Sequence, residues 1–168
     1  MRLFIAINFT PAFRQDLIDM QSALKKGGVS GNFTRAENLH MTLAFIGDYG
    51  SPDEVLDVME SVWFKPIRIE LDGLQPFRDM FFGRIADNRA LESFVRRLRR
   101  ALAEADIPFD RKKFSPHITL VRRADCVTGT PALPEEMPHG AMLADRVSLM
   151  LSERGRHGMV YTELGGIE

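Results

Sequence analysis

The sequence is poor in cysteine, histidine and tryptophan, which number one, four and one among its 168 residues. A single cysteine, Cys126, excludes an intrachain disulfide and fits a reducing compartment. Residues 123–125 beside it offer no clear group that would activate the thiol, so we expect it to be unreactive. No metal-ligand cluster, glycine-rich phosphate loop or G-x-S-x-G motif is present. We therefore expect neither a metal nor a cofactor.

Strong net charge and long apolar runs are missing as well. The net charge is −1 and the pI about 6.4, which argues against an extended surface for nucleic acid, although recognition of an RNA end alone would not need one. The apolar segment at residues 1–13 is too short and too interrupted for a signal peptide or a membrane span. We expect one cytoplasmic domain spanning residues 1–168, with no membrane or obligate protein partner, and a monomer by default.

What the sequence does contain is one four-residue motif, H-x-T-L, written twice, at residues 40–43 and 117–120. Both copies open a short apolar run that predicts a strand. Side chains i and i+2 of a strand share a face, so each motif presents an imidazole and a hydroxyl together while its second and fourth residues point into the core. Two imidazoles are a general acid and a general base, and two hydroxyls stabilise an oxyanion. This combination suits metal-free opening of a phosphate ester.

The remaining patterns predict a mixed order of helices and strands, which indicates an α+β fold with antiparallel sheet. Thr10 and Pro11 begin a helix that ends at Gly27, and a second helix begins with Ser51 as its cap. The third, residues 88–105, has the clearest apolar stripe. We expect strands at residues 2–8, 32–35, 40–47, 67–74, 80–86, 117–121, 145–153 and 159–167, with a long loop at 124–144 and a hairpin turn around 154–155.

Several residues invite a functional interpretation but have a plainer one. The arginines of residues 96–100 lie opposite the apolar stripe of their helix, so we expect them on a solvated face. The basic residues 111–113 are as consistent with guiding RNA as with a solvated loop. We expect His139 and His157 at the surface and Trp63 in the core.

The motifs and their surroundings resemble a known family. The segments NFTRAENLHMTLAFIGD and FSPHITLVR resemble the two signatures of the two-histidine phosphoesterases. The opening RLFIAI and the ending with SER and VYTEL are similar to those of the bacterial and archaeal RNA 2′,3′-cyclic phosphodiesterases, also called 2′-5′ RNA ligases. The likeness runs from end to end of the chain. Two departures are Phe33, where the family often has tryptophan, and the extra Arg156-His157.

This resemblance implies two pseudo-symmetric lobes, each a small antiparallel sheet flanked by helices, with an active-site cleft between them. It implies hydrolysis of a terminal 2′,3′-cyclic phosphate on RNA to a 2′-phosphate, without a metal. The site residues it implies are His40 as proton donor, His117 as proton acceptor, and Thr42, Thr119, Arg122 and Phe45 as substrate-binding residues.

Two questions stay open at the level of sequence. A regular strand turns Phe45 and Arg122 away from the motif face, so either each strand bulges or ends before that residue, or neither side chain reaches the site. The function has alternatives too: ligation of 2′-5′ RNA ends, hydrolysis of a small cyclic nucleotide, or binding of RNA ends without turnover.

Overall fold

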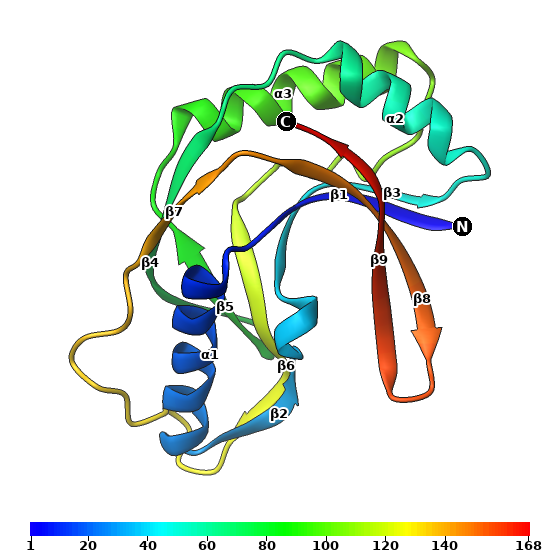
Figure 1. Ribbon diagram of the computed structural model, residues 1–168. Coiled ribbons are helices and arrows are strands. Elements are labelled where there is room, and N and C mark those ends of the chain that lie inside the picture. The colour runs from blue at the N-terminus through cyan, green and yellow to red at the C-terminus, as the bar shows by residue number, and fades with distance from the viewer.

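The computed structural model describes residues 1–168, and its helices and strands alternate along the chain (Figure 1). The helices are α1 (Pro11–Lys26), α2 (Pro52–Ser61) and α3 (Arg89–Glu104), with a short 3-10 helix η1 (Ala36–Asn38). The strands are β1 (Arg2–Asn8), β2 (Val29–Phe33), β3 (His40–Asp48), β4 (Ile67–Phe77), β5 (Met80–Ile85), β6 (His117–Cys126), β7 (Ala141–Ala144), β8 (Val147–Gly155) and β9 (Gly158–Ile167).

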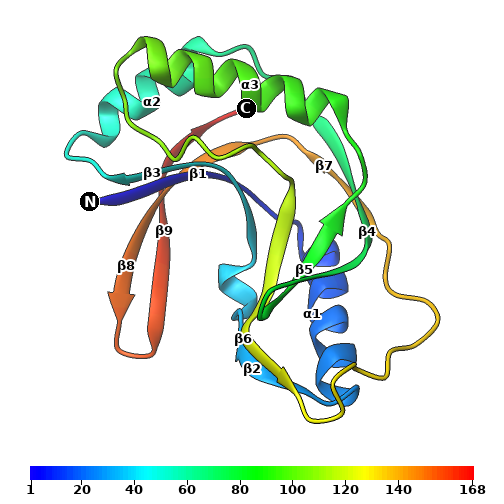
Figure 2. The same cartoon turned by 180° about the vertical axis from the view of Figure 1, so that it is seen from behind.

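The strands form two antiparallel sheets that share one plan. The first has the order β3-β1-β8-β9, and the second has the order β2-β6-β5-β4-β7. Each motif strand, β3 or β6, therefore begins a row of four, and β2 is added outside β6. Figures 1 and 2 show the sheets meeting along β3 and β6, with the turn end of the β8–β9 hairpin projecting beyond β1 and β3. The predicted α+β fold with two small antiparallel sheets is confirmed.

The helices cover the two sheets unequally. α2 and α3 lie side by side on the first sheet, while α1 packs against β2 and β6 of the second (Figure 1). The caps follow the sequence: the Thr10 hydroxyl accepts from the amide of Phe13 at 3.3 Å, and α1 ends at Gly27. Ser51 stands at the N-cap of α2 as predicted, but its side chain makes no capping hydrogen bond. No helix is long and apolar enough to span a membrane.

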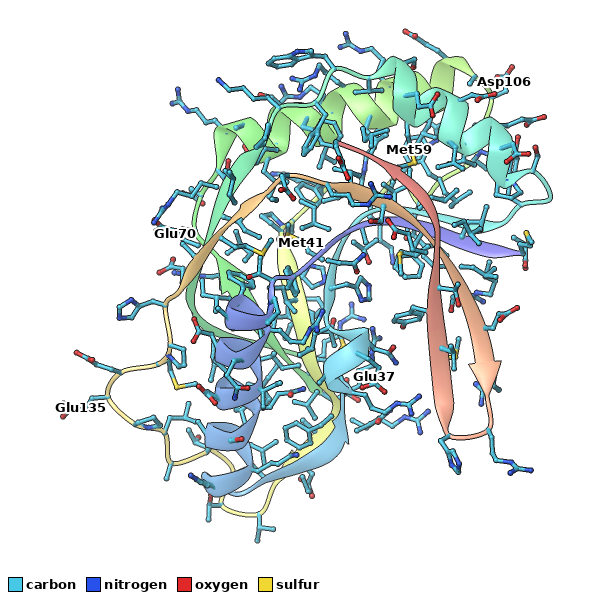
Figure 3. All side chains as sticks on the ribbon, in the orientation of Figure 1. Glu37, Met41, Met59, Glu70, Asp106 and Glu135 are labelled. Carbon is cyan, nitrogen blue, oxygen red and sulfur yellow. The ribbon has the colours of Figure 1, made fainter.

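A continuous apolar core joins the two sheets and the three helices. The alternate residues of both motifs, Met41, Leu43, Ile118 and Leu120, are fully buried in it, as the period-2 pattern predicts. Figure 3 shows Met41 well inside the molecule and Met59 of α2 on the side of that helix that faces the first sheet, where it is buried. The motif strands are thus anchored by one face, which leaves the other face available for a site.

The structure corrects four details of the predicted elements. Residues 124–144 are not all loop, since β6 continues to Cys126 and β7 pairs with β4. β2 begins earlier than predicted, at Val29. The β8–β9 turn lies at residues 156–157, because Gly155 still pairs with Gly158. Trp63 is 67% exposed rather than core, and the Arg97 guanidinium lies 5.3 Å from its ring centroid.

Candidate active site

The two motif strands carry the same irregularity at the same residue. The ladder between β1 and β3 skips Leu43, and the ladder between β5 and β6 skips Leu120. Both strands therefore bury two consecutive residues, Leu43-Ala44 and Leu120-Val121, where a regular strand would alternate. A bulge of this kind reverses the facing of the residues that directly follow it.

These bulges explain how Phe45 and Arg122 reach the site. Phe45 and Arg122 each come after a bulge, and both line cavities that also contain His40 and Thr42. Of the possibilities that the sequence left open, the structure has the one in which each motif strand bulges. Regular period-2 counting would have turned both side chains away from the site.

Each motif histidine has its Nδ1 atom fixed by the backbone carbonyl two residues before it. Nδ1 of His40 lies 2.7 Å from the carbonyl oxygen of Asn38, and Nδ1 of His117 lies 2.7 Å from that of Ser115. A carbonyl oxygen only accepts, so Nδ1 carries the proton and Nε2 is the nitrogen that exchanges protons in each ring. The two imidazoles are thus held in one tautomer by equivalent contacts.

The surroundings of the two rings differ at Nε2. The His40 Nε2 atom lies 2.9 Å from the Thr42 hydroxyl, and the His40 ring packs against Phe4 and Tyr161, with 4.9 and 5.2 Å between centroids. Burial lowers the pKa of His40, and the positive charges of Arg122 and His117 lower it further, while the bond to Asn38 opposes them. The one aromatic ring packed against His117 is that of Phe82, with 4.3 Å between centroids.

The carbonyl of each bulged leucine is held by a helix side chain. The Arg99 guanidinium of α3 donates to the Leu43 carbonyl from Nε and Nη2, at 3.2 and 3.1 Å, and from Nη1 to the Lys112 carbonyl at 2.6 Å. The Gln21 amide of α1 donates to the Leu120 carbonyl at 3.0 Å and to that of Thr34 at 2.8 Å. A buried carbonyl without a partner is costly, so these side chains stabilise the bulges.

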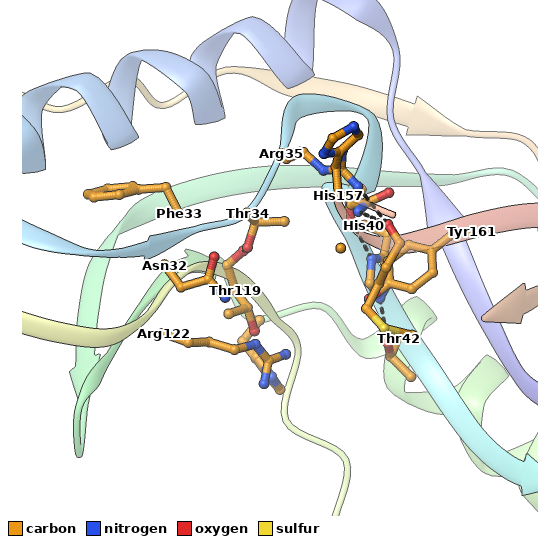
Figure 4. Close-up of a pocket in the computed structure, with 14 residues that line it drawn as sticks. Asn32, Phe33, Thr34, Arg35, His40, Thr42, Thr119, Arg122, His157 and Tyr161 are labelled. Atoms are coloured by element: carbon orange, nitrogen blue, oxygen red, sulfur yellow. Dashed lines mark hydrogen bonds between the residues drawn. The ribbon is translucent and has the colours of Figure 1, made fainter. Parts of the chain in front are cut away.

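Two cavities meet at this site. The first, of about 540 Å³, contains both histidines, both threonines and Arg122, and is closed by His157, Met159 and Tyr161 of the β8–β9 hairpin. The second, of about 550 Å³, shares His40, Thr42 and Arg122 with the first and adds Phe45. Figure 4 shows His40, Thr42 and Tyr161 on one side of the first cavity and Thr119 and Arg122 on the other. Each of the six predicted site residues therefore lines at least one of these two neighbouring cavities.

Sequence reasoning missed some of the residues that build this space. Helical periodicity predicts Arg99 on a solvated face, but its guanidinium binds the carbonyls of Leu43 and Lys112. Because Arg99 stands in a run of arginines, its sequence pattern does not distinguish it from solvated neighbours. His157 is exposed as predicted, yet it lines the first cavity. The basic residues 111–113 and His139 line neither cavity. No group of three or more His, Cys, Asp or Glu side chains that could hold a metal ion is present.

Comparison with known sequences identifies the family. The sequence model described as the 2′-5′ RNA ligase superfamily matches residues 15–156. The chain belongs to this superfamily. The predicted resemblance is thereby confirmed.

Similar members of the 2′-5′ RNA ligase superfamily include archaeal and bacterial proteins. The chain is 26% identical, over 88% of its length and 92% of the relative's, to an RNA 2′,3′-cyclic phosphodiesterase of Aeropyrum pernix. It superposes with a TM-score of 0.79 and 25% identity on a protein of Thermus thermophilus, covering 99% of this chain and 97% of that one. For Escherichia coli LigT in complex with 3′-AMP, the TM-score is 0.76, the identity 25%, and the coverage 98% and 95%.

Proposed function

We propose that this protein hydrolyses the 2′,3′-cyclic phosphate at the end of an RNA to a 2′-phosphate. The observation that carries the proposal is the pair of imidazoles, each with Nδ1 bound to a carbonyl, lining one cavity together with two hydroxyls and a guanidinium. The names of superfamily relatives from archaea and bacteria support this reaction. Catalysis by acid and base needs nothing beyond these side chains, and each group of this kind typically contributes about 10²–10⁴-fold to the rate.

The reaction replaces one phosphorus–oxygen bond by another. Water attacks phosphorus while Nε2 of His117 takes its proton. The bond from phosphorus to the ribose 3′ oxygen breaks, and Nε2 of His40 gives that oxygen a proton. The products are a 2′-phosphate and a 3′-hydroxyl, and exchange with solvent returns both rings to their starting states.

Thr42, Thr119 and Arg122 bind the non-bridging oxygens in this proposal. The hydroxyls are neutral donors, and the Arg122 guanidinium adds a charge-assisted bond where negative charge develops in the transition state. Thr42 also bonds to His40 in the free protein, so substrate would draw its hydroxyl away from Nε2. That exchange frees Nε2 to face the leaving oxygen.

The lowered pKa of His40 bears on which ring is the acid. In the free protein the shift favours neutral His40, whereas a proton donor must start charged. The bound cyclic phosphate brings a negative charge beside the ring, which stabilises the imidazolium. The proposed donor role therefore requires substrate to restore the proton on His40, and kcat should stay high at more alkaline pH than kcat/KM.

The test is incubation of the protein, with EDTA present, with a short RNA that ends in a 2′,3′-cyclic phosphate. We expect a 2′-phosphate product from the wild type, and losses of at least about 10²-fold in His40→Ala and in His117→Ala. His139→Ala, which removes a histidine outside both cavities, is the matched control.

Other outcomes separate the alternatives. Turnover of small cyclic nucleotides without turnover of RNA would indicate a mononucleotide enzyme, and joining of 2′-5′ ends would indicate a ligase. Tight binding of the RNA end with no product after hours would indicate a binding module. A variant that lacks either histidine yet keeps the wild-type rate would remove that ring from the mechanism.

A further inference from the structure

The second cavity has an unusual charge pattern for a protein whose net charge is −1. Its lining includes three arginines, Arg2, Arg122 and Arg154, and no carboxylate. It also includes the aromatic rings of Phe4, Phe45 and Tyr161. Three guanidinium groups around one hollow repel one another unless an anion lies between them, so this surface is suited to a negatively charged ligand.

Arg2 and Arg154 are presented by two neighbouring strands. Arg2 of β1 pairs with Ser152 of β8, and Arg154 comes two residues after Ser152, on the same face of the strand. The Arg2 guanidinium lies 5.3 Å from the centroid of the Phe45 ring. The partner of Arg2 on β3 is Asp48, whose carboxylate lies 3.9 Å from the amino group of Met1.

Neither arginine forms a salt bridge. The arginines that do are Arg35, Arg68, Arg84 and Arg146, and none of these lines the second cavity. A guanidinium holds phosphate through two parallel hydrogen bonds, and aromatic rings beside it suit a nucleobase or sugar. The chemistry of the second cavity therefore matches a nucleotide with its phosphate.

We propose that Arg2 and Arg154 bind the phosphate on the 5′ side of the terminal nucleoside, so that the protein selects RNA ends over mononucleotides. The proposal rests on the proposed function, because it takes the cyclic phosphate to lie at His40 and His117. Arg122 lines both cavities and marks where the two phosphates come closest. The reaction then takes place in the first cavity, and the second cavity binds the 5′-side phosphate that is present only when the RNA extends beyond its terminal nucleoside.

The test compares three substrates: adenosine 2′,3′-cyclic phosphate, the same nucleotide carrying a 5′-phosphate, and the dinucleotide ApA ending in a 2′,3′-cyclic phosphate. For the wild type we expect kcat/KM about 10–100-fold higher for the two that contain a 5′-side phosphate, in line with charge-assisted hydrogen bonds. In the double variant Arg2→Gln/Arg154→Gln, that preference should fall to about 3-fold or less. Arg156→Gln removes the same charge from the same hairpin outside both cavities, and should keep the preference.

A binding measurement tests the site without turnover. Calorimetric titration with adenosine 2′-monophosphate and adenosine 2′,5′-bisphosphate should show about tenfold tighter binding of the bisphosphate to the wild type but not to the double variant. Melting temperatures check that the variants fold.

Three results separate failure of this proposal from failure of the proposed function. Equal wild-type kcat/KM on all three substrates would overturn the role of Arg2 and Arg154 and leave the phosphodiesterase reaction intact. Equal losses of kcat/KM on all three substrates in the double variant would mean that Arg2 and Arg154 do not bind the 5′-side phosphate. Hydrolysis of none of them would refute the proposed function, and equal affinity for the two titrated nucleotides would then refute the phosphate site too.

Discussion

The two motif strands share a sequence pattern, a bulge and a histidine contact, yet one lies at the edge of its sheet and the other lies inside. β3 pairs with β1 alone, whereas β6 lies between β2 and β5. The Leu120 carbonyl therefore accepts from the Thr34 amide, beyond the end of β2, as well as from Gln21. The Leu43 carbonyl has no neighbouring strand, and Arg99 takes its place.

The segment before β6 completes this edge. The Asp110 amide donates to the Phe45 carbonyl at 2.8 Å, and Arg99 holds the Lys112 carbonyl in the same segment. Open strand edges are a liability unless they are covered. Because the covering segment leads directly to His117, Arg99 connects the two motif strands to each other. Equivalent motifs in the two sheets are therefore stabilised by different partners: a side chain and a loop segment for β3, and a neighbouring strand with Gln21 for β6.

Loss of the two supports should therefore have unequal effects. We expect Arg99→Leu to lower the free energy of unfolding by about 2–3 kcal/mol and kcat by about tenfold or more, because Leu43 and Lys112 both lose their donor. Gln21→Leu should cost about 1–2 kcal/mol and only a few-fold in kcat, since the Leu120 carbonyl keeps the Thr34 amide as a donor while the Thr34 carbonyl loses the donor that Gln21 supplied. Urea unfolding and kinetics on the cyclic-phosphate RNA measure both variants.

Arg99→Lys tests whether the geometry of the guanidinium matters as well as its charge. Arg99→Lys keeps the charge but not the planar fork, so it should recover only part of the loss. A larger effect from Gln21→Leu than from Arg99→Leu would contradict the edge argument.

The difference between the histidines should appear in the pH dependence of stability. The pKa of His40 in the folded protein is below its unfolded value of about 6.5, so the unfolded chain binds the extra proton first as the pH falls. The contribution of neutral His40 is complete above about pH 6.5. It is lost toward the folded pKa at up to about 1.4 kcal/mol per pH unit.

Urea unfolding between pH 8 and 5 measures this decline. His40→Gln should flatten it, and His117→Gln, which keeps His40, should retain the His40 contribution. An unchanged slope in His40→Gln would show that burial of this ring is not the cause.

The smallest expected effect concerns the charge that Arg122 places beside His40. Arg122→Gln removes a positive charge that lowers the pKa of His40, so that pKa should rise. NMR titration of the imidazole protons in the free protein measures the change directly. Arg123→Gln, on the same strand but outside both cavities, is the matched control, and an equal rise there would rule out a specific effect of Arg122.

Local patterns predicted much of the fold because the responsible interactions are local. Thr10 and Gly27 bound α1 through contacts within a few residues, and period-2 burial placed Met41 and Leu43 in the core. The short strand β7 and the exposure of Trp63 escaped because pairing with β4 and the reach of Arg97 depend on distant segments. Arg99 escaped for the same reason: helical periodicity gives the face of a side chain but not the length over which it reaches.

The sequence by itself determined the reactive groups: two imidazoles and two hydroxyls, paired by the spacing of H-x-T on strands. Only the tertiary structure decided that both pairs line one cavity, that bulges turn Arg122 toward that cavity and Phe45 toward the second one, and that Arg2 and Arg154 line the second cavity too. The physical reason is that the spacing of neighbours along a strand fixes which side chains share a face. The carbonyl partners of a bulge and the approach of two sheets depend on residues far apart in the chain.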